Sequence, residues 1–403
     1  MPPRPPLRVL QLITRLIVGG AQEHALATAL GQKRTPGMQV TLACGPTDGP
    51  EGDLLGAARA GGLEVQILPD LIRPIRPLTD TAALAKLTAF IRRGRFDVVH
   101  THSSKAGILG RLAARAAGTP IIVHTLHGLI FGDHARLAER IGYTVAERAA
   151  AAACDVIMDV SNETRRGALA SGVGRPDQHV TIYSGFPIEP FLRVRDTLSV
   201  EDAKRRLGLP PDALVVGKVA RLFHQKGHEY VIEAARIVCA KEPRARFVFV
   251  GDGVLRPMYE ARIRQLGLAD RFLFTGLLAP EAVPAAMQAM DISVLTSHRE
   301  GLARVIPQAH AVGKPVISFA LDGSLDCIED GVSGFLTKPH DADEVAARIL
   351  ELLPDEPRRR AMGEAGRRFA AANFPVEVMV ERTNEVYYRV AAEGRRGRRR
   401  IGG

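Results

Sequence analysis

The 403-residue chain contains no tryptophan, few aromatic residues and only four cysteines. Its basic stretches do not alternate with aromatic rings that could stack on bases, so we expect no nucleic acid as a partner. The cysteines are far apart and form no CxxC pair and no Cys/His cluster. We therefore expect buried, reduced thiols at Cys44, Cys154, Cys239 and Cys327.

Long apolar runs are also missing. None approaches the roughly 20 residues that a membrane-spanning helix needs. The first residues, MPPRPPLRVLQLI, lead into a predicted strand and not into a cleavable signal, so we predict a cytoplasmic protein. The formal net charge is +10, and five arginines lie within residues 394–403. A basic chain of this kind favours anionic substrates or a peripheral contact with the anionic inner face of a membrane.

What the chain does contain is a regular alternation of short apolar runs and longer amphipathic segments, which is typical of a parallel sheet covered by helices. Helices are expected over 79–93 and 105–117, where apolar residues recur three and four apart. Strands are expected to start at Leu7, Met38, Leu63, Phe96, Pro120 and Asp155, and then at Ala213, Arg246, Arg271, Asp291 and Pro315.

This rhythm divides the chain into segments. Residues 1–190 are predicted to form one Rossmann-like domain and residues 213–375 a second one. Residues 191–212 read as a linker, because the segment 184–212 contains four prolines and a short basic helix. Residues 376–393 read as a C-terminal helix and residues 394–403 as a basic, disordered tail. Ligands bind at the carboxyl ends of strands in open α/β sheets, so we expect the site in a cleft between the two halves.

Two cations follow the first strand of the second half. Arg221 and Lys226 lie on the loop ARLFHQKG, before a helix that is expected to start near Gly227. A guanidinium binds two phosphate oxygens at once and an ammonium adds a point charge, so the pair can neutralise a diphosphate without a metal. The structural alternative is two solvated surface cations.

Two helix starts offer backbone groups to a ligand. After the strand DISVLTS, Glu300 supplies an anionic acceptor and the next residues supply amides for phosphate or sugar hydroxyls; these residues are Gly301, Leu302, Ala303, Arg304 and Val305. In the first half, Gly19 and Gly20 precede a helix and allow a ligand close to the backbone. For both segments the alternative is an ordinary turn or a favourable helix start.

His127 follows a buried strand in IVHTLHGL, where an imidazole can bind phosphate or sugar oxygens, although a lone histidine is more often structural. His100, His102 and His124 on neighbouring strand ends raise a metal site, but the sequence shows no acidic partner for one, so we expect no metal. Gly251-Asp252-Gly253 lacks the third glycine of a dinucleotide fingerprint, which argues against an NAD-dependent oxidoreductase.

Taken in order, these motifs resemble glycosyltransferase family 4, the retaining nucleotide-sugar enzymes of the GT-B fold, over about residues 7–392. The resemblance implies two Rossmann-like domains that face each other across a cleft, the first on the acceptor side and the second binding the nucleotide sugar, with the C-terminal helix returning to the first. It rests on the Gly-Gly loop at Gly19, the HSSKAGILGRLAA run from His102, His127-Gly128, the Arg221/Lys226 pair, GDG at Gly251 and EGL at Glu300.

The resemblance also implies residue roles. Arg221 and Lys226 hold the diphosphate, with further contacts from Gly19 or Gly20 and from the amides of residues 302–305. His127 and Glu300 contact the transferred sugar. The family has a second glutamate eight positions after Glu300, for the ribose, and this chain has Gln308 there. The turn over residues 322–326 also departs from the family pattern, and its role stays open.

The implied activity is transfer of a sugar, with retention, from a UDP- or GDP-sugar to a glycan or lipid-linked acceptor, in cell-surface polysaccharide or glycolipid synthesis. No cofactor is expected, because the donor brings its own leaving group and positioned cations and amides can stabilise the charge that develops on it. Two alternatives remain: a nucleotide-sugar-binding protein with impaired catalysis, motivated by Gln308, and a GT-B epimerase acting on a UDP-sugar.

Overall fold

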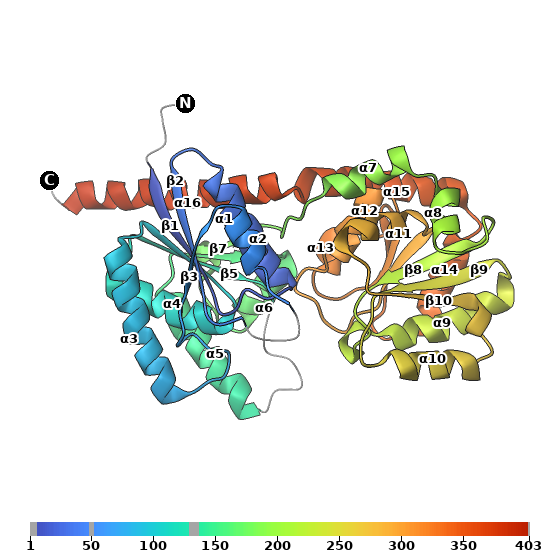
Figure 1. Cartoon of the computed structure of the whole chain (residues 1–403), viewed down its shortest axis with the longest axis horizontal. Coiled ribbons are helices and arrows are strands. Elements are labelled where there is room, and N and C mark those ends of the chain that lie inside the picture. The colour runs from blue at the N-terminus through green and yellow to red at the C-terminus, as the bar shows by residue number, and fades with distance from the viewer. Residues whose placement is uncertain (1–5, 48–51, 129–136, 402–403) are drawn as a thin grey trace. The chain divides into compact units, whose positions relative to one another are not determined.

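The computed structural model describes residues 6–47, 52–128 and 137–401 (Figure 1). The chain divides into two compact units. Unit 1 contains Met1–Phe186 and Val376–Gly403, and unit 2 contains Pro187–Pro375. Each unit is built on one parallel sheet with helices on both faces, which is the α/β class that the alternating apolar runs predict.

The sheet of unit 1 has seven parallel strands in the order β3-β2-β1-β4-β5-β6-β7. The apolar runs predict the first six strands of the chain but not β7, whose three residues carry no such run. The bounds are β1 (Leu7–Ile13), β2 (Met38–Cys44), β3 (Glu64–Ile67), β4 (Val98–His102), β5 (Ile121–Leu126), β6 (Val156–Asp159) and β7 (His179–Thr181).

The two faces of this sheet are covered by different helices, because successive side chains of a strand point to opposite faces. Leu10 and Leu12 of β1 share a buried cluster with the helices α3 and α4, whereas Val9 shares one with α16. The helices of unit 1 are α1 (Gly20–Lys33), α2 (Leu55–Ala60), α3 (Pro77–Gly94), α4 (Ser104–Ala117), α5 (Leu137–Ala152), α6 (Asn162–Ala170) and α16 (Val376–Ile401).

The C-terminal helix α16 belongs to unit 1, where Met379, Val386 and Tyr387 are buried against strands of the sheet. The helix continues to Ile401, beyond Glu393, where the helical pattern was expected to give way to a disordered tail. The apolar stripe does end there, but arginine is a good helix former and lets the backbone continue.

The sheet of unit 2 has six parallel strands in the order β10-β9-β8-β11-β12-β13. The short strand β13 was not predicted. The bounds are β8 (Leu214–Val219), β9 (Ala245–Val250), β10 (Phe272–Gly276), β11 (Ile292–Leu295), β12 (Val316–Phe319) and β13 (Gly334–Thr337). The main helices are α9 (His228–Lys241), α10 (Arg256–Gln265), α11 (Val283–Gln288), α12 (Val305–Val312), α13 (Ser324–Cys327), α14 (Ala342–Leu352) and α15 (Glu356–Asn373).

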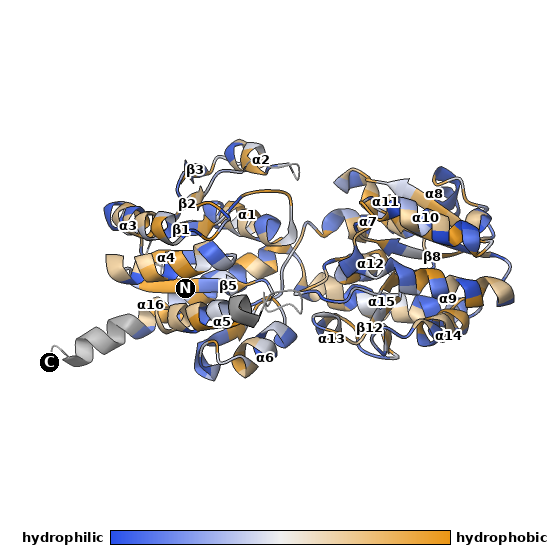
Figure 2. Ribbon diagram, turned by 90° about the horizontal axis from the view of Figure 1, so that it is seen from below, coloured by the Kyte–Doolittle hydropathy of each residue, from blue (hydrophilic) through white to orange (hydrophobic). Residues whose placement is uncertain are grey.

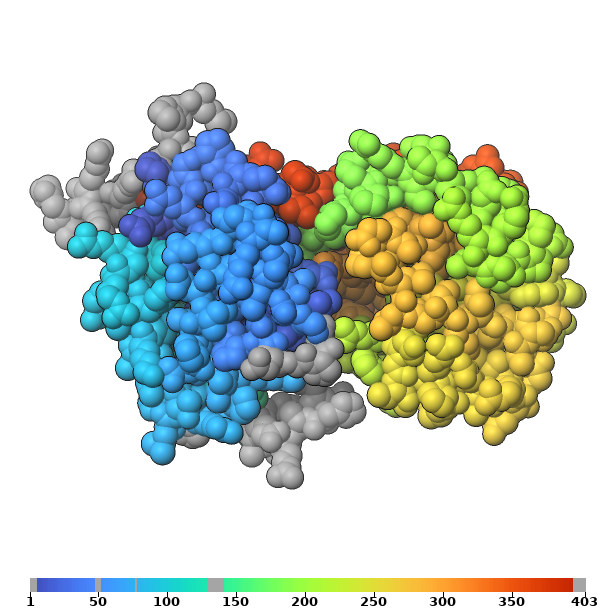
Figure 3. All heavy atoms as spheres, in the orientation of Figure 1, coloured from blue at the N-terminus to red at the C-terminus, as the bar shows by residue number. Residues whose placement is uncertain are grey.

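The predicted linker over residues 191–212 is instead part of unit 2. It contains α7 (Glu189–Thr197) and α8 (Val200–Arg206), and the segment lies against α11 and α12 (Figure 3). Phe191 and Val194 of α7 are buried, and the Ser199 hydroxyl caps α8 by accepting from the Asp202 N–H at 3.0 Å. Pro190 lies in the first turn of α7, and Pro210 and Pro211 follow α8, so these prolines lie at helix boundaries.

Apolar residues concentrate on the strands and on the sheet-facing sides of the helices (Figure 2). Cys44, Cys154 and Cys327 are buried and Cys239 is half-buried, and all four are free thiols, as expected. Burial raises the pKa of Cys44 and Cys239 to about 11 and that of Cys154 to about 12. Among the helices of the described ranges, none is both long and apolar enough to cross a membrane.

Two glycines inside helices should respond oppositely to substitution by alanine. At Gly363 in α15, an added Cβ would lie 2.0 Å from the carbonyl oxygen of Gly313, whereas at Gly142 in α5 it would meet nothing within 4 Å. We expect Gly363→Ala to lower the free energy of unfolding by about 1 to 3 kcal/mol through overpacking. Gly142→Ala should raise it by about 0.5 to 1 kcal/mol, because alanine is the better helix former. Urea unfolding checks both values, and equal effects would contradict the packing of α15 on α12.

Candidate active site

Three loops of unit 2 leave the carboxyl ends of β8, β11 and β12, which are neighbours in the sheet. The first loop carries Arg221 and Lys226, the second carries Glu300, and the third carries Asp322. Because parallel strands end at the same edge, this topology brings together side chains that are up to about a hundred residues apart in the chain.

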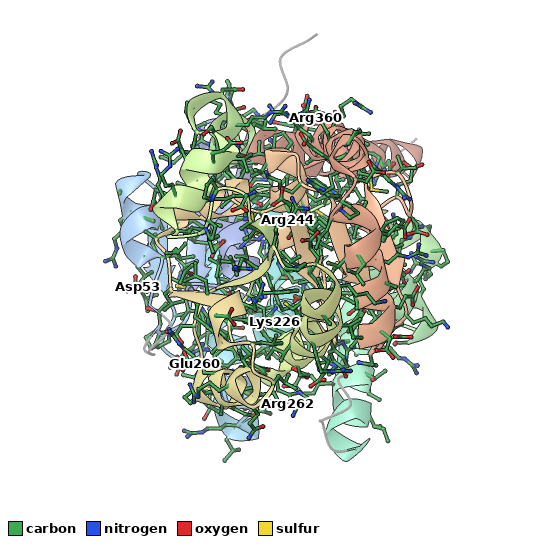
Figure 4. All side chains as sticks on the ribbon, turned by 90° about the vertical axis from the view of Figure 1, so that its right-hand side faces the viewer. Asp53, Lys226, Arg244, Glu260, Arg262 and Arg360 are labelled. Atoms are coloured by element: carbon green, nitrogen blue, oxygen red, sulfur yellow. The ribbon has the colours of Figure 1, made fainter. Side chains whose placement is uncertain are left out.

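The predicted residues Lys226 and Glu300 contact each other directly. The Lys226 ammonium donates to Oε1 of Glu300 at 2.5 Å, and the two side chains are 27% and 21% exposed. Lys226, labelled in Figure 4, therefore lies at the surface but is held by an opposite charge. An ammonium has three donors, so this ion pair leaves donors for an anionic ligand.

Arg221 lies on the same loop and is exposed. Within the described ranges its guanidinium has no hydrogen-bond or ion-pair partner. The next residue, Leu222, anchors the loop, because its N–H donates to the Asp252 carbonyl and its own carbonyl accepts from Leu255. The Gly251-Asp252-Gly253 turn that resembles a nucleotide fingerprint thus supports the Arg221 loop.

Gly227 fixes the position of Lys226. Its φ of 59° lies in the left-handed region, and an added Cβ would lie 2.0 Å from the Thr296 carbonyl oxygen at the end of β11. The Thr296 hydroxyl in turn donates to the Gly227 carbonyl at 2.6 Å. The loop after β8 is thereby locked to the strand end from which the Glu300 segment leaves.

The turn over residues 322–326, whose role the sequence leaves open, supports Glu300. The Glu300 N–H donates to Oδ2 of Asp322 at 2.7 Å. A Cβ on Gly323 would lie 2.6 Å from the Gly301 carbonyl oxygen, so the two turns pack backbone to backbone. Burial raises the pKa of Asp322, while its hydrogen bond with Glu300 acts in the opposite direction.

The helix after Glu300 starts later than expected. Helix α12 begins at Val305, so residues 301–304, with Leu302 and Ala303 among them, form the turn before the helix and are not its first residues. Gln308 is half-buried in the first turn of α12, and in the described part of the chain its side-chain amide has no hydrogen-bond partner.

Lys218 is a site residue that sequence reasoning missed. It is buried in β8, and its ammonium donates to the Thr296 hydroxyl at 2.9 Å. Burial lowers the pKa of Lys218 to about 7; Lys226 acts in the same direction, and Glu300 opposes it. The sequence signal for this residue was a lysine inside the apolar run ALVVGKVA. Lys218 places a second ammonium near Lys226.

In unit 1, Gly20 is the first residue of α1 and Gly19 precedes it, with the Glu23 N–H donating to the Gly19 carbonyl at 2.8 Å. His127 follows β5 and is half-buried. The ring of His24, on α1, contacts the His127 ring edge-on at a centroid distance of 4.8 Å. His24 was not predicted; a histidine shortly after the Gly-Gly turn was the only signal in its favour.

A chain of hydrogen bonds fixes the tautomer of His127. Nε2 of His127 lies 3.1 Å from Nδ1 of His102, whose Nε2 lies 2.7 Å from Oε1 of Gln11. The Gln11 amide is oriented by its Nε2, which donates to Gln32 and to the Tyr387 hydroxyl. An amide oxygen only accepts, so His102 is protonated on Nε2 and accepts on Nδ1 from His127. Burial holds the pKa of His102 well below its usual range, which keeps that ring neutral.

The other predicted histidines have structural partners. His100 contacts the Tyr387 hydroxyl at 2.5 Å and the Thr125 hydroxyl at 2.7 Å, and His124 contacts the Thr101 hydroxyl at 2.9 Å. In the described part of the chain, two groups could offer ligand atoms to a metal, each set within 4.8 Å: His24, His102 and His127 in unit 1, and His224, Glu229 and His298 in unit 2. In the first group, the hydrogen bonds of His102 described above use both of its ring nitrogens.

Two family models together match most of the chain. The model of the glycosyl transferase 4-like domain matches residues 19–185, and that of the glycosyl transferases group 1 matches residues 199–369. The chain belongs to glycosyltransferase family 4. Each match falls within one unit, and the group 1 model starts between α7 and α8 of unit 2.

Relatives of this glycosyltransferase include two bacterial enzymes, each 31% identical to it. The UDP-Gal:alpha-D-GlcNAc-diphosphoundecaprenol alpha-1,3-galactosyltransferase of Escherichia coli matches over 293 residues, covering 72% of this chain and 74% of that one. The D-inositol 3-phosphate glycosyltransferase of Acidothermus cellulolyticus matches over 351 residues, covering 83% and 76%.

A solved structure shows the same fold. Anabaena Alr3699/HepE in complex with UDP aligns with a TM-score of 0.80 at 23% identity, over 94% of this chain and 99% of that one. The predicted GT-B architecture of two Rossmann-like domains is thereby confirmed for this glycosyltransferase.

The buried histidines of this glycosyltransferase should make its stability depend on pH. Burial holds the pKa of His100, His102 and His124 well below the unfolded value near 6.5. Below about pH 6.5 the unfolded chain therefore binds more protons, and stability falls as the pH falls, by up to about 1.4 kcal/mol per pH unit for each histidine. His124→Asn, which can keep a hydrogen bond to Thr101, should reduce the dependence of stability on pH by up to the contribution of one histidine.

The control is His340→Asn, at an exposed residue with a φ of 66° that asparagine tolerates. It should leave the slope unchanged. Urea unfolding between pH 5 and 8 measures all three proteins, and a parent chain with no acid slope would show that these histidines protonate in the folded state.

Proposed function

We propose that this glycosyltransferase moves a sugar from a UDP- or GDP-linked donor to a glycan or lipid-linked acceptor, with retention of anomeric configuration and without a metal. The observation that carries the proposal is the cationic edge of unit 2, where Arg221 and Lys226 lie on one loop and Glu300 contacts Lys226 at 2.5 Å. The E. coli relative is named for a UDP-sugar donor and a lipid-diphosphate acceptor, which supports the proposed nucleotide-sugar donor and the proposed lipid-linked acceptor.

The cations act on the leaving group. As the bond between the anomeric carbon and the phosphate oxygen breaks, negative charge develops on the diphosphate, and fixed donors stabilise it most where they are already in position. Lys226 is in position through Gly227 and Glu300, and the Lys218 ammonium of β8, with a pKa of about 7, adds part of a further positive charge. Arg221 can add a bidentate contact. These groups stabilise the negative charge on the diphosphate that a divalent cation would otherwise neutralise.

Glu300 and His127 are the proposed sugar contacts. Glu300 is a carboxylate whose backbone is tied to Asp322, so it can hold a sugar hydroxyl while positive charge develops on the ring. The His127 ring, which donates from Nε2 to Nδ1 of His102, is the proposed contact of unit 1 with the sugar. In a front-face substitution, the acceptor oxygen bonds to the anomeric carbon while the phosphate oxygen leaves and takes the acceptor's proton.

A lipid-linked acceptor would suit a basic chain in which no described helix crosses a membrane. The five arginines of residues 394–403 would add electrostatic attraction to an anionic surface. This contact is the peripheral membrane association that we propose for the enzyme, in polysaccharide or glycolipid synthesis.

The diphosphate role of Arg221 can be tested by binding of UDP and of uridine, both measured by calorimetry in EDTA. Arg221→Met should weaken UDP binding by about ten- to a hundredfold, because a charged hydrogen bond contributes about 1.5 to 3 kcal/mol, and should leave uridine binding unchanged. Arg236→Met, at an exposed position of α9, is the matched control. Loss of UDP binding in EDTA, or equal losses for UDP and uridine, would count against a metal-free cation site.

The roles of Glu300 and Gln308 should differ in kind. Glu300→Gln keeps the shape but removes the charge, so turnover in a sugar-transfer assay should fall while UDP binds at least as tightly, because Lys226 loses its counter-charge. Gln308→Glu should tighten UDP binding by about two- to tenfold with little change in turnover, since a carboxylate adds an acceptor for the ribose at about 0.5 to 1.5 kcal/mol. An inactive Gln308→Glu enzyme beside a fully active Glu300→Gln enzyme would reverse the two assignments.

A further inference from the structure

The opposite edge of the unit 2 sheet carries a second group of cations. A cavity of about 630 Å³ opens there, and Lys204, Asp291, Lys314 and Arg359 line it. Lys204 lies on α8 and Arg359 on α15, Asp291 directly precedes β11, and Lys314 lies just before β12. These are the amino ends of the strands, whereas Lys226 and Glu300 follow the carboxyl ends. A six-residue strand separates the two edges by roughly 20 Å.

The floor of this cavity has an excess of positive charge. Lys204, Lys314 and Arg359 are only 6%, 8% and 9% exposed. The carboxylate among them is that of Asp291, which lies 3.1 Å from the Lys204 ammonium and 3.6 Å from the Arg359 guanidinium. Oδ2 of Asp291 also accepts from the Val215 N–H at 2.8 Å. Three buried cations thus share one carboxylate.

The rim carries two ion pairs and two further carboxylates, those of Glu201 and Asp212, which are exposed to solvent. Arg195 contacts Glu364, and Arg360, labelled in Figure 4, contacts Glu356 at 3.0 Å. Both pairs line the cavity but lie closer to the surface than the floor. The excess of positive charge therefore lies on the buried floor, whereas the two further carboxylates of the rim are exposed, where solvent screens them.

Lys314 is the cation that lacks a partner. Lys204 donates to the Ala213 carbonyl at 2.7 Å and Arg359 to the Leu352 carbonyl at 2.9 Å. The Lys314 ammonium, in contrast, has no hydrogen bond or ion pair within the described residues, although its side chain is more than nine-tenths buried. An ammonium that is largely desolvated, opens only on the cavity and has no partner is costly in free energy. Burial lowers the pKa of Lys314 to about 8, and Lys204, Arg195 and Arg359 act in the same direction, while Asp291 opposes them.

We propose that this cavity is a binding site for the phosphate group of a small phosphorylated molecule, which Lys314, Lys204 and Arg359 contact. A phosphate monoester carries close to two negative charges, which matches the excess of two positive charges on the floor. Ammonium and guanidinium groups are the usual partners of phosphate. The cavity is larger than inorganic phosphate, so the polar rim surrounds the body to which the phosphate is attached.

The site is tested with the full chain and two probes, inorganic phosphate and glycerol 3-phosphate, with glycerol as the neutral control. Calorimetry and thermal shift should show binding of both anions by the parent chain. Lys314→Met should weaken that binding at least tenfold. Without phosphate this variant should melt no lower than the parent, because it removes an unpartnered buried charge and keeps the length of the side chain. Lys314→Gln serves as a second variant, and Lys241→Met, at the exposed end of α9, is the matched control that should behave like the parent.

Phosphate could also reach the proposed donor site, so Arg221→Met is measured in parallel. Binding that is lost in Lys314→Met and kept in Arg221→Met supports the new site. Binding that is kept in Lys314→Met and lost in Arg221→Met overturns it and leaves the proposed function standing. Absence of phosphate binding in the parent chain also overturns it, as does binding of phosphatidate-containing vesicles without any binding of glycerol 3-phosphate.

Discussion

The order of three parallel strands in unit 2 is the constraint on which its candidate chemistry depends. Since β8, β11 and β12 are neighbours and run the same way, all their carboxyl ends face one side and all their amino ends the other. The loop of Arg221 and Lys226, the Glu300 turn and the Asp322 turn are therefore adjacent without any sequence proximity. Close backbone contacts, such as that of Gly227 with the Thr296 carbonyl, then hold these loops in fixed positions relative to one another.

Charge is handled differently at the two edges of this sheet. At the carboxyl edge, Lys226 is paired with Glu300 and remains partly exposed, so a ligand can enter without breaking a buried network. At the amino edge, three cations are buried around Asp291, and desolvation makes their mutual repulsion stronger than at a surface. The first arrangement suits a nucleotide that must be released after each turnover. The second suits a ligand whose own charge completes the site.

Much of the fold could be predicted from the sequence, because buried parallel strands are apolar on both faces and stand out as runs. The runs that begin at Leu7 and Ala213 coincide with β1 and β8 almost to the residue. The strands β7 and β13 could not be found in this way, since strands of three and four residues at a sheet edge carry too little pattern. Helix α7 was hidden because Pro190 in its first turn looks the same as a proline in a linker, whereas the short basic helix expected in this segment corresponds to α8.

Site residues that belong to a sequence motif could be predicted. Site residues that are distinguished only by their contacts in the folded protein could not. Arg221, Lys226 and Glu300 follow strands in recognisable motifs, and the last two are in contact. Lys218, Asp322 and Lys314 carry no motif, and what distinguishes them is burial, a backbone hydrogen bond or a missing partner. These properties depend on which strands are neighbours, and a linear sequence does not state them.

The histidines of unit 1 show that residues distant in the sequence can fix the tautomer of a site residue. Tyr387 lies on the last helix of the chain, yet its hydroxyl accepts from the Gln11 amide on the first strand. That contact, together with Gln32, decides which way the amide points, and the amide oxygen decides which nitrogen of His102 carries the proton. Because Nδ1 of His102 then accepts, the hydrogen bond between the two rings places the proton of His127 on Nε2. If the Gln11 amide were turned over, both tautomers would reverse. The C-terminal helix thus influences the hydrogen bonding of a strand-end histidine in unit 1 through Gln11 and His102.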